Sequence, residues 1–220
     1  MVTFMSARCA WLILLLAVTA LGQEGTPLII SQSPDESMGL AVFYNESGNV
    51  TAVKLLLLPS REELADVTGR FTRGATVQWA PDSSKVAANG FADGRYENCV
   101  IFKRTEDGLT ELPGPEEAIA DVLEQAMTAV RKRNKLPENA YQRRIWDKFT
   151  VRKWIDADTI ELLVHCSRIE YPRDAHGKTH DEDGYQFSVN LRCTLKLKDD
   201  DQKWEVLETR EVGESEVLGD

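Results

Sequence analysis

The chain has 220 residues, of which 42% are hydrophobic and 28% are charged, and its formal net charge is −10. This length and apolar content are enough for one domain of moderate size with its own core, so disorder is not the default expectation. An acidic chain repels phosphate backbones and anionic lipid unless its cations are segregated, which argues against a nucleic-acid partner.

The first 22 residues have the layout of a secretory signal peptide. Arg8 supplies a positive start, an apolar run follows over residues 9–18, and the small residues Ala20 and Gly22 fit a signal-peptidase site. The alternative, an uncleaved anchor, would need about 20 apolar residues to span a bilayer. We therefore predict cleavage before Gln23 and export to the periplasm or outside the cell. The mature chain, residues 23–220, loses one Arg and no acid, giving a net charge of −11 and no membrane association.

Residues 75–88 predict a β-hairpin. Val77 and Trp79 alternate with polar residues, the segment Pro81-Asp82-Ser83-Ser84 favours a turn, and apolar alternation then resumes. Asp93-Gly94 and Asp107-Gly108 are tight-turn dipeptides between further strand-like runs. Residues 75–112 therefore predict a four-stranded meander.

Two other regions predict similar units, and one segment predicts a helix. Residues 27–60 contain a Ser-Pro-Asp turn at 33–35 between apolar runs, and residues 61–66 suggest one helical turn. Residues 148–212 contain four strand-like runs. Between them, residues 116–135 carry an amphipathic stripe with acids at the start and cations at the end, which predicts a long helix. The stripe consists of Ile119, Val122, Leu123, Ala126 and Val130.

The segment Val77-Gln-Trp-Ala-Pro-Asp-Ser-Ser-Lys-Val resembles the blade motif of bacterial WD40-like propeller repeats of the TolB type. Residues 33–35 and 154–158 resemble weaker copies. A closed propeller has about four to eight blades of about 40–45 residues, more than this chain can supply. The resemblance therefore implies a mainly β fold, with one long helix and two to three antiparallel meander sheets in an open, propeller-like arrangement. The resemblance does not imply a function, because proteins that share a fold can have unrelated functions.

The mature chain has three cysteines, Cys99, Cys166 and Cys193. If residues 159–171 and 185–198 form a hairpin, Cys166 and Cys193 would face each other, and an oxidising compartment would favour a disulfide. The alternative is three buried thiols.

Candidate catalytic and metal-binding residues are few. His176, His180, Asp181 and Asp183, in the loop 172–184, are the weak metal candidates, although two glycines in the loop argue against a helical HxxxH site. Asp156 and Asp158 could act as an acid–base pair, but turn chemistry also explains them. Hydrolase, Walker and dinucleotide-binding motifs do not occur. The sequence therefore predicts no catalytic residue, no resident metal and no cofactor.

Cations gather in one place, at Arg131, Lys132, Arg133, Lys135, Arg143 and Arg144. They suit either an acidic partner or the C-terminal end of a helix dipole. We expect an exported, non-catalytic interaction or scaffold module that binds a protein partner through loops or a sheet edge. The alternative is a secreted hydrolase, or a glycan or metal binder, that uses loop 172–184.

Overall fold

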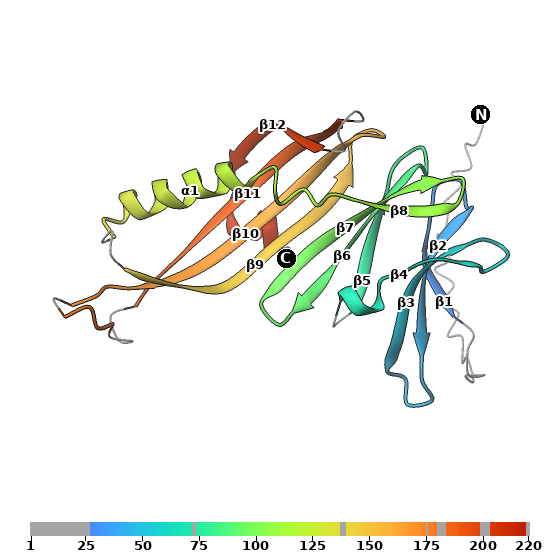
Figure 1. The fold of residues 1–220 in the computed structure, drawn as a ribbon, viewed down its shortest axis with the longest axis horizontal. Helices are drawn as coiled ribbons and strands as arrows, with labels where there is room; N and C mark the ends of the chain where they lie inside the picture. The colour runs from blue at the N-terminus through green and yellow to red at the C-terminus, as the bar shows by residue number, and fades with distance from the viewer. Residues whose placement is uncertain are drawn as a thin grey trace, which may run out of the picture.

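A computed structural model describes residues 27–71, 74–136, 140–174, 176–179, 184–198 and 203–218. The described chain is mainly β and has one long helix, as the sequence predicts. Its strands form two hydrogen-bonded sheets (Figure 1). The predicted signal peptide lies outside the described residues. Among the described helices, none is long and apolar enough to cross a membrane.

The first sheet is a four-stranded antiparallel meander. Its strands are β1 (Leu28–Gln32), β2 (Met38–Tyr44), β3 (Val50–Leu57) and β4 (Glu63–Asp66). The helical turn expected over residues 61–66 is wrong, because β4 pairs with β3 and brings Glu63 and Asp66 to Lys54. The cross-strand ion pairs outweigh the weak helical preference of so short a segment.

The second sheet has eight strands and consists of two meanders. The first contains β5 (Ala75–Trp79), β6 (Lys85–Asp93), β7 (Tyr96–Thr105) and β8 (Gly108–Leu112). The second contains β9 (Tyr141–Trp154), β10 (Thr159–Tyr171), β11 (Tyr185–Lys198) and β12 (Lys203–Glu211). A short parallel pairing, Tyr96 with Asp147 and Glu97 with Lys148, joins β7 to β9. The predicted meander over residues 75–112 is confirmed, whereas the last unit begins seven residues before the predicted residue 148.

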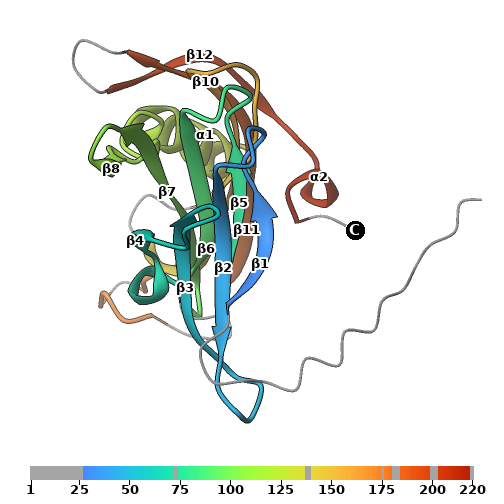
Figure 2. The ribbon, with the colours of Figure 1, turned by 90° about the vertical axis from the view of Figure 1, so that its right-hand side faces the viewer.

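Apolar side chains fill the space on both sides of the β6–β7 hairpin. Val86 and Phe102 face the first sheet, whereas Ala87 and Ile101 face β9 and its neighbours. The three meanders are therefore packed in series, with β5–β8 in the middle (Figure 1), and the view of Figure 2 has β1–β4 nearest the viewer. Asn89, on β6, strengthens the contact between the second and third meanders, because its amide forms two hydrogen bonds with the backbone of Val151 on β9, at 3.0 and 2.9 Å.

Helix α1 (Ala120–Arg133) packs on the same face of β9–β12 as β6 and β7 do, farther along the strands (Figure 1). The predicted apolar stripe is confirmed as the packed face, and it includes the fully buried Ile119. The helix begins later than the predicted residue 116, because residues 115–119 form turns that carry Ile119 into the core. A second, short helix, α2 (Glu214–Leu218), follows β12, and its Val217 is buried.

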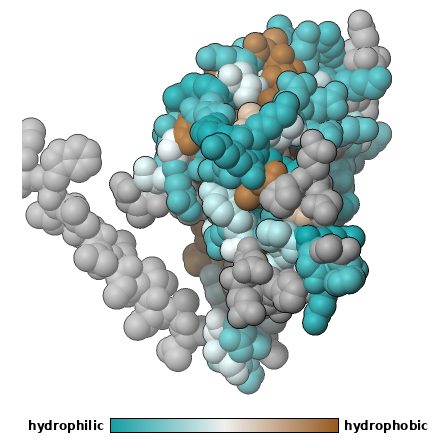
Figure 3. Space-filling model, turned by 90° about the vertical axis from the view of Figure 1, so that its left-hand side faces the viewer, coloured by the Kyte–Doolittle hydropathy of each residue, from teal (hydrophilic) through white to brown (hydrophobic). Residues whose placement is uncertain are grey.

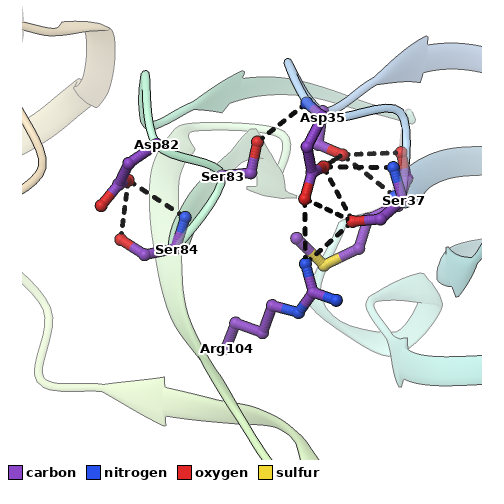
Figure 4. A network of polar contacts seen from close by, with 8 residues as sticks. Asp35, Ser37, Asp82, Ser83, Ser84 and Arg104 are labelled. Atoms are coloured by element: carbon purple, nitrogen blue, oxygen red, sulfur yellow. Dashed lines mark hydrogen bonds and ion pairs between the residues drawn. The ribbon is translucent and has the colours of Figure 1, made fainter.

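The turns after β1 and β5 have the same geometry. Asp35 accepts hydrogen bonds from the backbone and hydroxyl of Ser37, and Asp82 does the same for Ser84 (Figure 4). The residues after the two aspartates have positive φ angles, 58° at Glu36 and 60° at Ser83. Such side-chain-to-backbone bonding is the turn chemistry expected of Asp and Ser.

Contacts between neighbouring meanders also recur. The Trp79 indole donates to the Ser31 hydroxyl, and the Trp154 indole donates to the Gln78 carbonyl, both at 2.9 Å. In each case the tryptophan that ends the first strand of one meander bonds to the first strand of the preceding meander.

Candidate functional site: a groove between α1 and β9

A groove of about 440 Å³ runs between α1 and the strands β9 and β10. One wall is a face of the helix, with Leu123, Met127, Thr128 and Arg131 along its length. The floor is formed by Gln142 and Phe149 of β9 and Arg168 of β10; Glu116, Ala120 and Glu124 complete the lining. We call this hollow the α1–β9 groove, and its volume is within the range of ligand sites.

A buried ion pair lies under the middle of the groove. Asp147, on β9, accepts two hydrogen bonds from the guanidinium of Arg168, and both side chains are nearly buried. Arg144 lies 3.6 Å from the same carboxylate, half exposed, and its guanidinium sits over the Tyr96 ring. Because Asp147 is already engaged by Arg168, Arg144 contributes a further positive charge.

A second buried carboxylate lies where α1 ends. Glu170, on β10, has a side chain only 2% exposed, and its Oε1 is 2.8 Å from Arg131 Nε and 3.1 Å from the Gln142 amide nitrogen. The other oxygen, Oε2, is buried without a hydrogen-bond partner. The pair fixes the end of α1 to the sheet, since burying a carboxylate is unfavourable unless a cation accompanies it.

The opposite end of the groove is acidic and closed by aromatic packing. Burial raises the pKa of Glu116, while backbone N–H groups of Glu116 and Cys99 oppose the rise. Burial, with the nearby charges of Glu116 and Asp147, raises the pKa of Tyr96 to about 12. The Tyr96 ring meets Phe149 edge to face at 6.0 Å.

Glu116→Gln should stabilise the protein at neutral pH. A carboxyl whose pKa is raised by folding destabilises the fold when ionised, and that penalty disappears as pH falls below the pKa of the unfolded chain. The amide keeps an oxygen for the backbone N–H groups. Urea unfolding of both proteins at pH 7 and pH 4 should show a gain at pH 7 that shrinks at pH 4. A loss of stability for Glu116→Gln at pH 7 would contradict this assignment.

The outer side of the groove is an open strand edge. β9 pairs with β10 along its whole length, but β7 pairs with it only at Asp147 and Lys148. Of the strands that the structure describes, none pairs with the other edge of β9 from Tyr141 to Trp146. A bulge falls within this stretch, between the residues opposite Ser167 and Arg168. The open edge offers backbone donors and acceptors to an extended peptide.

The predicted basic cluster is divided between the C-terminal end of α1 and the open edge of β9. Three of its members have carboxylate partners: Arg131 with Glu170, Arg144 with Asp147, and Arg133 with Glu211. The others, Lys132, Lys135 and Arg143, are exposed and have no ion pair among the described residues. The side of the molecule that faces left in Figure 1 has a mostly hydrophilic surface with a few hydrophobic patches (Figure 3).

Of the two possibilities for Cys166 and Cys193, a disulfide or buried thiols, the structure has the thiols. The hairpin of β10 and β11 exists, but its register pairs Cys166 with Val189 and Cys193 with Leu162, so the thiols are four positions apart. Both cysteines and Cys99 are free and buried, and burial raises the pKa of all three thiols. They pack in the core as small apolar groups.

The candidate metal residues of loop 172–184 are only partly described. His180, Asp181 and Asp183 lie outside the described residues, while His176 is exposed in a turn where its backbone bonds to Asp174. Within the described ranges, no group of three or more His, Cys, Asp or Glu side chains is placed to hold a metal.

His165 lies apart from that loop. It is buried in the middle of β10, where its Nδ1 is 2.6 Å from the Asn190 amide oxygen and its ring meets Trp146. Six residues of strand separate His165 from the end of β10, about 20 Å at 3.3 Å per residue. His165 and the loop are therefore not brought together.

Asp156 and Asp158 form a turn rather than an acid–base pair. Asp156 accepts the backbone N–H of Asp158, and this bond, with one from Thr159, lowers the pKa of Asp156. Asp158 forms an ion pair with the buried Lys85 at 2.7 Å, which links the third meander to the second.

Sequence reasoning found the basic cluster but not the groove. Asp147, Glu170 and Arg168 appear as isolated charges in strand-like runs, and only the pairing of β9 with β10 and the return of α1 bring them together. The sequence did contain one signal of this site: charged residues at strand positions that the alternation of apolar and polar residues predicts to face inward. No protein-family model matches the chain, and no curated protein matches it either.

Proposed function

We propose that the protein is an exported, non-catalytic interaction module that binds a protein partner at the α1–β9 groove. The observation that carries this proposal is the open edge of β9 beside a groove of ligand-binding size. Edge strands are usually kept short or covered, and an open one next to a groove is a common place for an extended peptide to dock.

Five of the described acids have structural roles that leave them poorly suited to catalysis. Asp35, Asp82 and Asp156 have lowered pKa values because they bond to serine, threonine and backbone groups of their own turns. Asp147 and Glu170 are held by arginines. These carboxylates are engaged in holding the fold, whereas a catalytic acid or base needs a free carboxyl facing substrate.

We also propose that the three meanders stack as blades of an open, propeller-like assembly of the TolB type. Two features support this proposal: the turns after β1 and β5, 47 residues apart, have matching hydrogen bonds, and the indoles of Trp79 and Trp154 make corresponding contacts between meanders. In such a stack α1 covers the part of the β9–β12 meander that the β5–β8 meander leaves uncovered. The predicted signal peptide is the basis for placing the protein outside the cytoplasm.

Filling the groove should abolish partner binding. Thr128→Trp places an indole in the groove from the exposed side of α1, and Ala129→Trp, at an exposed position that lines a separate hollow along α1 and not the groove, is the matched control. Pull-downs from the exported fraction with residues 23–220 as bait should recover the same proteins with wild type and Ala129→Trp and lose them with Thr128→Trp. Identical recovery with all three baits would refute binding at this groove.

A further inference from the structure

We infer that the partner presents a short, extended segment that combines acidic and apolar side chains, and that the acidic side chains lie at the end of the groove where α1 ends. This inference rests on the proposed interaction role and specifies the chemistry of the partner. It is based on the distribution of charge and apolar surface along the groove.

The end of the groove near the C-terminus of α1 is positively charged. Arg131 and Glu170 pair at this end, and next to them, under the middle of the groove, Arg144 and Arg168 share the carboxylate of Asp147. These five groups therefore leave one positive charge. The exposed Lys135, just beyond α1, and the exposed Arg143, on the open edge of β9, add two more; the C-terminal end of the helix dipole accounts for the presence of Lys135 but does not neutralise it.

The middle and the other end of the groove differ from this basic end. Leu123, Met127 and Phe149 provide an apolar stretch, and beyond it lie Glu116 and Glu124. A segment with acids along its whole length would meet these carboxylates. A segment whose acids occupy one end and whose apolar side chains follow matches the groove along its length.

The charge of the whole protein limits the partner further. A net charge of −10 repels long polyanions, so nucleic acid and sulfated glycans are disfavoured even at a local basic site. A short segment that contacts only the basic end avoids most of this repulsion. The occupant is therefore a peptide segment of a partner protein rather than a polymer of uniform negative charge.

Binding of fluorescein-labelled peptides, measured by anisotropy, tests this inference. The probes are extended peptides of about eight residues, which span about 26 Å: two glutamates followed by alternating valine and serine, the same peptide with two lysines, and the same peptide with two glutamines. We expect the glutamate peptide to bind on the order of tenfold more tightly than the glutamine peptide, and the lysine peptide to bind more weakly than either.

Charge reversal locates the contact. Lys135→Glu/Arg143→Glu should remove the preference for the glutamate peptide, whereas the control Lys103→Glu/Lys196→Glu, which reverses two exposed lysines away from the groove, should keep it. Equal loss in the control would show a non-specific charge effect and overturn the inference, as would tighter binding of a heparin oligosaccharide than of the peptide.

The outcomes separate the inference from the proposed function. If the three peptides bind equally and Thr128→Trp abolishes binding of all three, the groove binds peptides but the acidic partner is wrong. If Thr128→Trp changes no binding and the pull-downs also show no dependence on it, the proposed function itself is wrong.

Discussion

Replacing Asp147 with alanine should lower the free energy of unfolding by about 3–5 kcal/mol, because it leaves the guanidinium of Arg168 buried without its counter-ion. Arg168 is only 12% exposed and donates two hydrogen bonds to the lost carboxylate. Arg144 cannot compensate, since it carries the same charge. Urea denaturation followed by tryptophan fluorescence measures the effect, with the slope of the transition checked for two-state behaviour.

Two controls make the Asp147 result specific. Glu63→Ala removes an exposed ion pair with Lys54 and should cost at most about 1 kcal/mol. Asp147→Leu/Arg168→Met removes both charges and should recover most of the loss, because apolar side chains often replace a buried ion pair at little cost. If Asp147→Ala behaves like Glu63→Ala, the pair does not carry the buried electrostatic role assigned to it.

Replacing Trp154 with alanine should cost about 3–5 kcal/mol, as for other buried aromatic residues cut back to a methyl group. Trp154 is 7% exposed, and its ring packs against Trp204 at a centroid distance of 6.5 Å. Its indole also donates to the Gln78 carbonyl, which joins the second and third meanders. Both packing and a contact between meanders are lost together.

Trp154→Phe separates these two contributions. A smaller aromatic ring remains while the hydrogen bond to Gln78 is lost, so we expect a cost of about 1–3 kcal/mol, the range for a buried carbonyl left without its donor. Thermal and urea unfolding of both variants give the comparison. A loss below about 1 kcal/mol for Trp154→Ala would show that the third meander does not depend on this contact.

Local patterns predicted the elements of this fold well. Pro81-Asp82 and the Asp-Gly dipeptides mark turns through their own backbone preferences, so β5 to β8 were predicted close to their observed bounds. The stripe beginning at Ile119 predicted α1 because its period follows helix geometry. The strand β4 was missed because its four residues form a strand only through pairing with β3.

Contacts between distant segments could not be predicted in this way. The spacing of Cys166 and Cys193 suggested a disulfide, but the register of β10 against β11 pairs each with an aliphatic residue. A shift of four residues leaves the same side chains facing the core, so the alternation of apolar residues could not reveal this register. Likewise, the groove depends on α1 lying back over the sheet. Its floor joins residues from β9 and β10, so no single stretch of sequence carries its signature.

Hydrogen exchange of residues 23–220 with and without the glutamate–valine–serine peptide shows where on the protein the peptide binds. Binding in the α1–β9 groove predicts new protection of backbone amides in Tyr141–Trp146 and in the last turns of α1, with no change in the edge strands β1 and β12. Protection confined to loop 172–184 or to β1, with Tyr141–Trp146 exchanging as fast as in the free protein, would contradict it.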